Sequence, residues 1–297
     1  MKTERDIGSY TFMIFGAGGS LGKAIAGRLA SPMSSEYRIF TFDHSKADIS
    51  DPNHIIPLIE YVKPTVIINC ASVSDPDICE EAHDGATLVN CTGPAILAKA
   101  AKEFGAKFVH FSTAHVFDGR KLSPYSERNR TSPINHYGLS KLAGEKMIKR
   151  IFPESLIIRP GMVFGLESPS NIAAWISMAE QKKEIGVLNN YISPTYAPDL
   201  AEATMELVLK GATGVYHIAN SGHTTHEMFV KAVLGLSGIP PSTVQADKNL
   251  HSMFKAQIPH NTMLLTTKYE QIMKHPLRQW EDALKHCLFA MRRYSPK

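Results

Sequence analysis

The chain has 297 residues, of which 43% are hydrophobic and 20% are charged. These proportions are typical of a globular chain that buries a sizeable core as one domain or two, and they exclude disordered and fibrous proteins. The formal net charge is only +4, and Lys and Arg are dispersed among acids, so no nucleic-acid partner is expected. The longest uncharged apolar runs are strand-sized, far below the roughly 20 residues that a membrane helix needs, so no membrane span is expected.

The N-terminus and the cysteines indicate the compartment. Residues 1–6 carry charges, but no apolar stretch with a small-residue cleavage site follows them, so no secretory signal is expected. The four cysteines, Cys70, Cys79, Cys91 and Cys287, form no Cys-x-x-Cys pair. They are predicted to be reduced thiols rather than disulfides or metal ligands. A cytoplasmic enzyme is the prediction.

Hydrophobic periodicity predicts that strands and helices alternate through the first half of the chain. The expected strands are 10–15, 38–42, 65–69, 107–111 and 156–158, and the expected helices are 21–29, 55–61, 86–104 and 136–151. Because the strands are nearly all apolar, an α/β fold is predicted, with a doubly wound parallel sheet covered on both faces. After residue 160, prolines interrupt the pattern, and a smaller mixed C-terminal part is expected.

A glycine-rich segment, Gly16–Gly22, lies at the first strand-to-helix junction. Glycines there let the backbone turn tightly and aim helix N-terminal amides at a pyrophosphate, which favours a dinucleotide site. The spacing is Gly-x-x-Gly-x-x-Gly, because position 21 is Leu. A nucleotide-hydrolase loop ending in Gly22-Lys23 is disfavoured, since Ala24 follows where a hydroxyl must bind magnesium. A glycine turn without a ligand stays open.

Polar residues at the end of the second strand and after it indicate which coenzyme, NAD or NADP, could bind. Asp43 ends this strand, where a carboxylate can accept hydrogen bonds from the adenosine ribose, which favours NAD. His44 and Lys46 follow and could neutralise a 2′-phosphate, so NADP stays open. Asp48-Ile49 could approach the adenine. A role for Asp43 in the turn alone is the alternative.

A tyrosine and a lysine, Tyr137 and Lys141, lie one helical turn apart on one face of the predicted helix 136–151. An ammonium held near the phenol would lower the tyrosine pKa and make Tyr137 a plausible proton donor. Thr113 follows the strand 107–111, and the carboxyl ends of parallel strands meet at one crevice. Its hydroxyl could therefore hydrogen-bond a carbonyl oxygen there, although a turn or a cap is the alternative.

Together these residues resemble the extended short-chain dehydrogenase/reductases, and specifically the dTDP-4-dehydrorhamnose reductase family, over most of the chain. The segments that carry the resemblance are 16–22, 69–72, Asn90, Ser112-Thr113 followed by 116–119, 137–146, 159–160, Pro194-Thr195 with Asp199-Leu200, and 214–217. The resemblance implies that Thr113, Tyr137 and Lys141 are the catalytic residues. Tyr137 and Lys141 are also candidate cofactor-binding residues. The other candidates are Gly16, Gly19, Ser20, Leu21, Gly22, Asp43, His44, Asp48, Ile49, Ala71, Ser72 and Val73.

The resemblance also implies a division of the chain. A Rossmann domain for NAD or NADP is expected over 1–160, with a returning strand and helix from 195–220. A mainly substrate-binding part is expected over 161–297. The candidate substrate contacts are Ser74, Thr113, Ala114, His115, Met162 and Thr195.

Several of these positions depart from the family. Thr113-Ala114-His115 stands where the rhamnose-forming reductases usually have Thr-Asp-Tyr, Met162 replaces a Trp, and Ser74 and Pro76 replace Thr and Val. The sugar is therefore open, and the 189–195 segment could be a lid, a sugar contact or a plain loop. No metal is predicted.

Two histidines, His223 and His226, are three residues apart and lack a third ligand nearby, which makes a poor zinc site. Thr224 and Glu227 instead predict a capping box that opens a helix. Near the C-terminus, Trp280 is expected on the core face of a helix.

The expected function is reduction of a nucleotide-activated 4-keto-6-deoxy sugar by NADPH or NADH, with the proton supplied by Tyr137. A homodimer is one expectation for the assembly. Two alternatives stay open. One is an epimerase or dehydratase that uses the same trio. The other is a coenzyme-binding regulatory subunit, like the non-catalytic partner of methionine adenosyltransferase.

Overall fold

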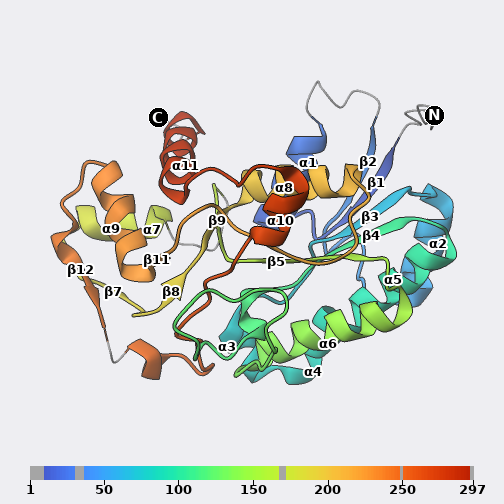
Figure 1. Ribbon diagram of the computed structural model, residues 1–297, viewed down its shortest axis with the longest axis horizontal. Coiled ribbons are helices and arrows are strands. Elements are labelled where there is room, and N and C mark those ends of the chain that lie inside the picture. Colours follow the sequence, from blue (N-terminus) through green and yellow to red (C-terminus); the bar gives the residue numbers. More distant parts are fainter. Residues whose placement is uncertain (1–9, 31–36, 167–171, 248–249, 295–297) are drawn as a thin grey trace.

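The computed structural model describes residues 10–30, 37–166, 172–247 and 250–294 (Figure 1). Residues 1–6, considered above for a secretory signal, lie outside the described residues. A parallel six-stranded sheet has the order β10-β5-β4-β3-β1-β2. Its strands are β1 (Thr11–Phe15), β2 (Arg38–Phe42), β3 (Val66–Asn69), β4 (Lys107–Phe111), β5 (Leu156–Pro160) and β10 (Gly214–Ile218).

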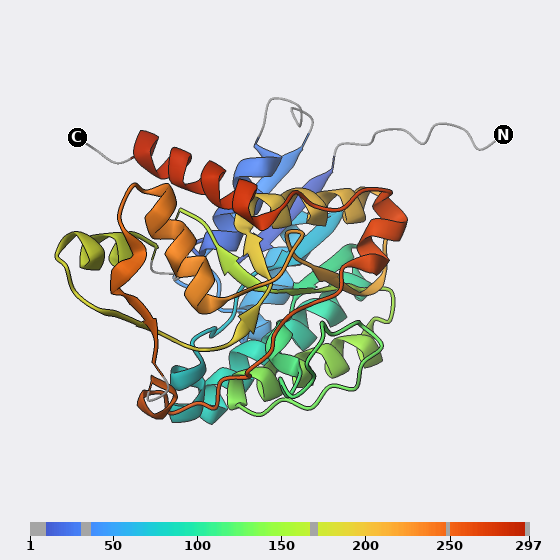
Figure 2. The same cartoon turned by 60° about the vertical axis from the view of Figure 1, so that its left-hand side comes forward.

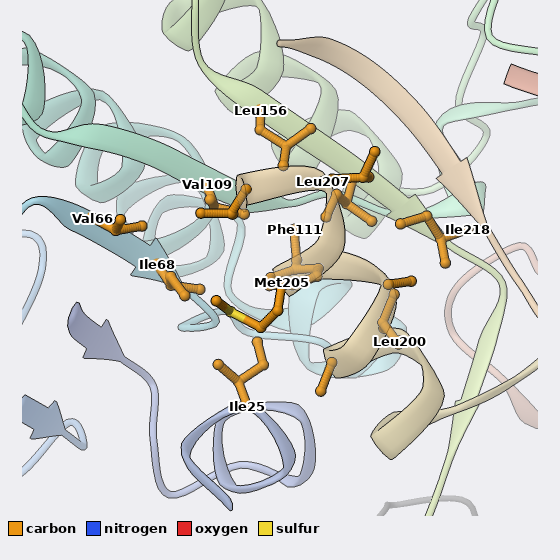
Figure 3. Packing of buried hydrophobic residues seen from close by; sticks show 14 of the residues in the cluster. Ile25, Val66, Ile68, Val109, Phe111, Leu156, Leu200, Met205, Leu207 and Ile218 are labelled. Atoms are coloured by element: carbon orange, nitrogen blue, oxygen red, sulfur yellow. The ribbon is translucent and has the colours of Figure 1, made fainter. Parts of the chain in front are cut away.

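Helices cover both faces of the sheet (Figure 1). One face packs against α1 (Ser20–Leu29), α8 (Ala197–Leu209) and α10 (Thr267–Met273), and Figure 3 shows Met205 between Ile68 of β3 and Ile25 of α1 on this face. The other face packs against α2 (Pro52–Val62), α5 (Gly93–Glu103) and α6 (His136–Ile151). Apolar residues on both sides of each strand bury both faces. The predicted doubly wound α/β fold is confirmed.

The helix expected over 86–104 is not one regular helix. It is divided into α4 (His83–Thr87), a π-helical turn (Leu88–Thr92) and α5. The turn places the fully buried Asn90, whose Oδ1 accepts from the Val73 amide at 3.0 Å and whose Nδ2 donates to the Val73 carbonyl at 2.9 Å. Widened turns of this kind often occur at functional sites, and this one holds the segment that follows β3.

Among its described residues, the C-terminal part contains three small two-stranded sheets. Its strands are β6 (Met162–Phe164) with β9 (Pro194–Tyr196), β7 (Ile185–Val187) with β12 (Val244–Ala246), and β8 (Tyr191–Ile192) with β11 (Thr224–Thr225). Its helices are α7 (Ile172–Glu180), α9 (His226–Leu236) and α11 (Trp280–Tyr294). Trp280 is buried with Leu284 and Cys287 in one core cluster, as the periodicity predicts.

The helix start predicted at Thr224 is displaced by one residue. Thr225 is the N-cap of α9, and its hydroxyl accepts from the Met228 amide at 3.1 Å. Glu227 pairs with Lys231 along the helix instead of completing a capping box. The hydroxyl that caps is the one whose backbone immediately precedes the helix.

A segment after β12, residues 255–262, crosses from the C-terminal part to the helices below the sheet (Figure 2). The Ala256 amide donates to Asp77 at 2.9 Å on the short helix α3 (Pro76–Glu81). Asn261 donates to the carbonyl of Lys121. The two parts of the chain are therefore joined on the side where α3 and α6 begin. Over the described ranges, no helix is long and apolar enough to cross a membrane, and all four cysteines are free thiols.

Candidate active site

A groove runs along the carboxyl ends of the parallel strands. It consists of one hollow of about 470 Å³ between the sheet and the C-terminal part, and another of about 500 Å³ below the glycine loop. Gly19, Cys70 and Ser72 line both. The two hollows therefore adjoin, and one extended ligand could occupy both.

The glycine loop is shaped by close backbone contacts. Gly16 has φ +75°, and a Cβ there would lie 2.4 Å from the Ala71 nitrogen. A Cβ on Gly22 would lie 2.3 Å from the Gly16 carbonyl oxygen, whereas one on Gly19 would meet nothing closer than 3.5 Å. Gly16 and Gly22 are thus required by the turn itself, and Gly19 leaves space on the groove side.

The first turn of α1 faces this space. The amides of Ser20, Leu21 and Gly22 belong to this turn, where amides have no acceptor within their own helix. Three such groups at the positive end of a helix form an anion site. The loop therefore fits the pyrophosphate of a dinucleotide.

We expect Gly22→Ala to weaken coenzyme binding at least tenfold, because the added methyl group collides with the Gly16 carbonyl. Gly27→Ala is the matched control on the same helix, since a Cβ there meets no atom within 4 Å. It should raise stability by about 0.5–1 kcal/mol without changing affinity. Titration of NADPH by fluorescence, with thermal unfolding of each variant, measures both effects. Equal affinities in the two variants would contradict this account of the loop.

The adenosine end of the groove is lined by Asp43, His44, Asp48 and Ile49, together with Ala71 and Val73. The Asp43 carboxylate accepts from the Ser45 hydroxyl at 2.5 Å and lies 3.7 Å from the Lys46 ammonium. The Ser45 hydrogen bond, helped by Lys46, lowers the pKa of Asp43. Asp48 is held by Ser50 in the same manner. The ionised Asp43 can therefore accept a hydrogen bond from a ribose hydroxyl, and the Lys46 ammonium beside it could neutralise a 2′-phosphate.

Thr113, Tyr137 and Lys141 line the other hollow together. Tyr137 is the second residue of α6, and Gly138 behind it packs so closely that a Cβ would lie 2.2 Å from the His115 carbonyl oxygen. Thr113 follows β4 and is a hydrogen-bond partner of the Tyr137 phenol. Lys141 is buried and donates to the Phe111 carbonyl at 2.5 Å. The strand end and the helix start thus bring the three side chains together.

The expected lowering of the Tyr137 pKa by Lys141 is wrong. Burial raises the pKa of Tyr137 to about 12, and only the Thr113 hydrogen bond opposes this. The ammonium is directed to the Phe111 carbonyl. Burial lowers the pKa of Lys141 to about 8, against the opposing charge of Glu145. The site therefore presents a protonated phenol, which suits proton donation.

Below these residues lies a buried ion pair between Glu145 of α6 and Arg159 of β5. Glu145 accepts from Arg159 Nε and Nη2, both at 2.7 Å, and from the Ser112 hydroxyl at 2.6 Å. Arg159 is 3% exposed and Glu145 is fully buried. Because these contacts join α6 to β5 and to Ser112, the residue that follows β4, they fix the helix that carries Tyr137 and Lys141.

Five of the six candidate substrate residues lie in the cleft and one does not. Ser74, Ala114, His115 and Met162 line it with Thr113. Thr195 is fully buried, and its hydroxyl donates to the Ser193 carbonyl at 3.3 Å. It belongs to β9, which pairs with β6, so its side chain is enclosed by the C-terminal part.

The wall formed by the C-terminal part was largely missed by sequence reasoning. Its residues are Leu188, Asn190, Ile192, His226, Ile258 and Thr262. Asn190 and Ile192 fall within the 189–195 segment, for which a lid or a contact was one option. Nothing in the spacing of the others indicates a site, because they come from separate elements.

No group of three or more His, Cys, Asp or Glu side chains within the described ranges could hold a metal ion. His223 instead makes a 3.0 Å hydrogen bond with the Ser193 hydroxyl. His226 packs edge-on against Trp175.

A dinucleotide groove beyond the strand ends, with Thr, Tyr and Lys at one end of it, defines an oxidoreductase of the extended short-chain dehydrogenase/reductase class. Sequence comparison places the chain more narrowly. The RmlD substrate binding domain family matches residues 10–293, and the chain belongs to this family.

Similar proteins span nearly the whole chain. The spore coat polysaccharide biosynthesis protein SpsK of Bacillus subtilis is 30% identical, covering 93% of this chain and 96% of its own. The dTDP-4-dehydrorhamnose reductase of Escherichia coli is also 30% identical, with the same shares covered. The dTDP-4-dehydrorhamnose reductase of Bacillus anthracis, solved in complex with NADP, superposes with a TM-score of 0.90 at 28% identity, covering 95% of this chain and 99% of that one.

Proposed function

We propose that this protein reduces a nucleotide-activated 4-keto-6-deoxy sugar with NADPH or NADH. In support, its relatives are named dTDP-4-dehydrorhamnose reductase, and one of them was solved in complex with NADP. The observation that carries the proposal is the position of Thr113, Tyr137 and Lys141. They line the hollow that continues the groove of the glycine loop. A keto sugar there would meet both the proton donor and the reducing end of the coenzyme.

The proposed reaction is a hydride transfer coupled to a proton transfer. When bound, NADPH or NADH would supply the hydride from C4 of its nicotinamide. Tyr137 donates its phenolic proton to the carbonyl oxygen as that oxygen becomes an alkoxide. The Thr113 hydroxyl stabilises the negative charge that develops on the same oxygen. Lys141, held at the Phe111 carbonyl, would hydrogen-bond the nicotinamide ribose and support the reprotonation of Tyr137 after the transfer.

A dehydratase is disfavoured by the residues beside Thr113. Such an enzyme commonly needs an acid and a base there, and Ala114 and His115 supply no carboxylate. An epimerase that retains its NAD and a purely regulatory subunit differ from a reductase in that neither consumes NADPH or NADH. An activity assay therefore distinguishes them. The coenzyme is proposed as NADP or NAD, because Asp43 suits a ribose hydroxyl while Lys46 lies beside it.

Steady-state oxidation of NADPH and NADH by the purified protein tests the proposal, with dTDP-4-dehydrorhamnose and other nucleotide keto sugars as substrates. We expect one equivalent of reduced sugar for each coenzyme consumed, without any added protein. The regulatory alternative would be favoured by a protein that binds the coenzyme, reduces no keto sugar, and changes the activity of a partner enzyme when the two are mixed.

We further propose that residues 1–160, with the return from 195–220, bind the coenzyme, and that 161–297 mainly bind the sugar. The positions of Met162, Asn190 and Thr262 in the sugar-side hollow support this division. A homodimer, a cytoplasmic location and the lack of a nucleic-acid partner stay predictions.

A further inference from the structure

Asn135 connects the start of α6 with His115 and with the 255–262 segment. It is the N-cap of α6 and is 2% exposed. Its Oδ1 accepts from the Gly138 amide at 2.8 Å. Its Nδ2 donates to the Gln257 carbonyl at 2.7 Å and lies 3.3 Å from Nδ1 of His115. Each polar atom of this side chain therefore has a partner.

The orientation of the Asn135 amide follows from two independent partners. The Gly138 N–H can only donate, so the atom that faces it is the oxygen. The Gln257 carbonyl can only accept, so the atom that faces it is the nitrogen. An amide nitrogen cannot accept a hydrogen bond. Nδ1 of His115 must therefore be the acceptor, and the neutral ring carries its hydrogen on Nε2.

The Nε2 atom of His115 is available to a ligand. Within the described ranges it has no hydrogen-bond partner, and it is not among the polar atoms sealed from solvent. His115 lines the cleft beside Thr113 and Tyr137, and its ring meets the Tyr137 ring edge-on with centroids 5.4 Å apart. An N–H group is thus placed next to the proposed proton donor.

The ring is also neutral at physiological pH. Burial lowers the pKa of His115 to about 4, and no charged side chain contributes to that shift. Tyr137 is the titratable group that packs against it, and its raised pKa keeps it uncharged. His115 can therefore act as a hydrogen-bond donor without adding charge to the site.

We propose that Asn135 is a positioning residue that holds His115 in its Nε2–H form, and that His115 donates this hydrogen to a sugar hydroxyl oxygen next to the keto carbon. The inference rests on the proposed reductase function and specifies one feature of its substrate. A bound sugar without that oxygen would shield the donor from water and leave it unpaired, and such a sugar is rejected. Asn135 acts only through His115, whereas His115 contacts substrate.

The substrate contact is tested with two variants of His115. His115→Phe keeps a ring against Tyr137 but removes the donor, and we expect kcat/KM for the keto sugar to fall by about 10- to 100-fold. His115→Gln, whose amide can donate, should recover part of this loss. The Kd of NADPH should be unchanged in both. If His115 only filled the wall, His115→Phe would leave kcat/KM unchanged, and that result would overturn the proposal.

The role of Asn135 is tested by ¹⁵N NMR of the histidine side chains, which needs no substrate. In the wild type we expect a bare Nδ1 and a protonated Nε2 on His115. Asn135→Asp preserves the helix cap but turns an acceptor toward His115, so Nδ1 should gain the hydrogen and the His115 pKa should rise. We then expect kcat/KM to fall and to acquire a new pH dependence near the histidine range, with NADPH affinity unchanged.

Asn135→Ser is the second variant, because a carboxylate opposite the Gln257 carbonyl could impair folding. Serine still caps the helix but donates to neither partner, and a mixture of His115 tautomers is expected. A hydrogen found on Nδ1 in the wild type would overturn the inference. If the wild type reduces no keto sugar, the proposed function fails together with the sugar contact, and the NMR result alone then decides the role of Asn135.

Discussion

Replacing Tyr137 with Phe is expected to lower kcat for keto-sugar reduction by about 10²- to 10⁴-fold, the contribution usual for a positioned general acid. The phenol is buried with a pKa raised to about 12, so it is protonated throughout the assay range and is ready to donate. The phenyl ring preserves the contact with His115. Coenzyme affinity should therefore stay near that of the wild type.

The control for this prediction is Tyr61→Phe, which removes the hydroxyl of an 85% exposed tyrosine on α2 and should leave kcat unchanged. Single-turnover reduction monitored by NADPH absorbance separates the chemical step from product release. Near-normal reduction by Tyr137→Phe would remove Tyr137 from the mechanism.

The Lys141→Met variant should show both a lower kcat and weaker NADPH binding.

The pH dependence distinguishes the two residues. Burial lowers the pKa of Lys141 to about 8, so its ammonium is present below that pH and is lost above it. For the free enzyme, kcat/KM should therefore decline as pH rises through about 8. In Lys141→Met this alkaline decline should disappear. A decline that persists in Lys141→Met would assign it to another group.

Local sequence patterns predicted the sheet and the glycine loop at its first strand-to-helix junction, because the causes of both are local. Apolar strands bounded by turns are specified within a few residues, and Gly16 and Gly22 are required by contacts within the loop or with the adjacent strand end. The start of α6 is similarly local, since Asn135 caps it through Gly138.

The errors came from contacts between distant segments. The pKa of Tyr137 is not lowered by Lys141, because the Phe111 carbonyl, 30 residues away, holds the Lys141 ammonium. Thr195 follows a cleft-lining segment but is enclosed by the pairing of β9 with β6. Ile258 and Thr262 enter the cleft only because the 255–262 segment crosses between the two parts. None of these contacts leaves a periodic signal in the sequence.

The second large effect is expected from Glu145→Ala, which removes one partner of the buried pair below the site. Arg159 is 3% exposed and would lose both of its hydrogen bonds to Glu145, leaving a buried charge without its counter-charge. Breaking such a pair costs about 3–5 kcal/mol of unfolding free energy. Lys285→Ala is the surface control, because its pair with Asp282 is 58% exposed on each side and contributes little. Urea unfolding at neutral pH measures both.

The contribution of Glu145 should also depend on pH in a defined direction. Burial alone would raise its pKa, but the hydrogen bonds and charge of Arg159, with Ser112, outweigh burial and hold the pKa below the ordinary 4.5. A carboxyl whose folded pKa is depressed stabilises the fold above its unfolded pKa, and this stability is lost as pH falls through the folded value. The stability difference between wild type and Glu145→Gln should therefore shrink below pH 4.5.

Glu145→Gln separates charge from shape, because it keeps an acceptor oxygen for Ser112 and Arg159 while removing the negative charge. A stability difference from the wild type that stays constant between pH 7 and pH 4 would mean that the ionised form of Glu145 is not what stabilises the fold. Because Glu145 lies one turn beyond Lys141 on α6, its loss should also reduce kcat at temperatures where the variant remains folded. Equal kcat in the folded variant would show that α6 holds Tyr137 and Lys141 in place without this pair.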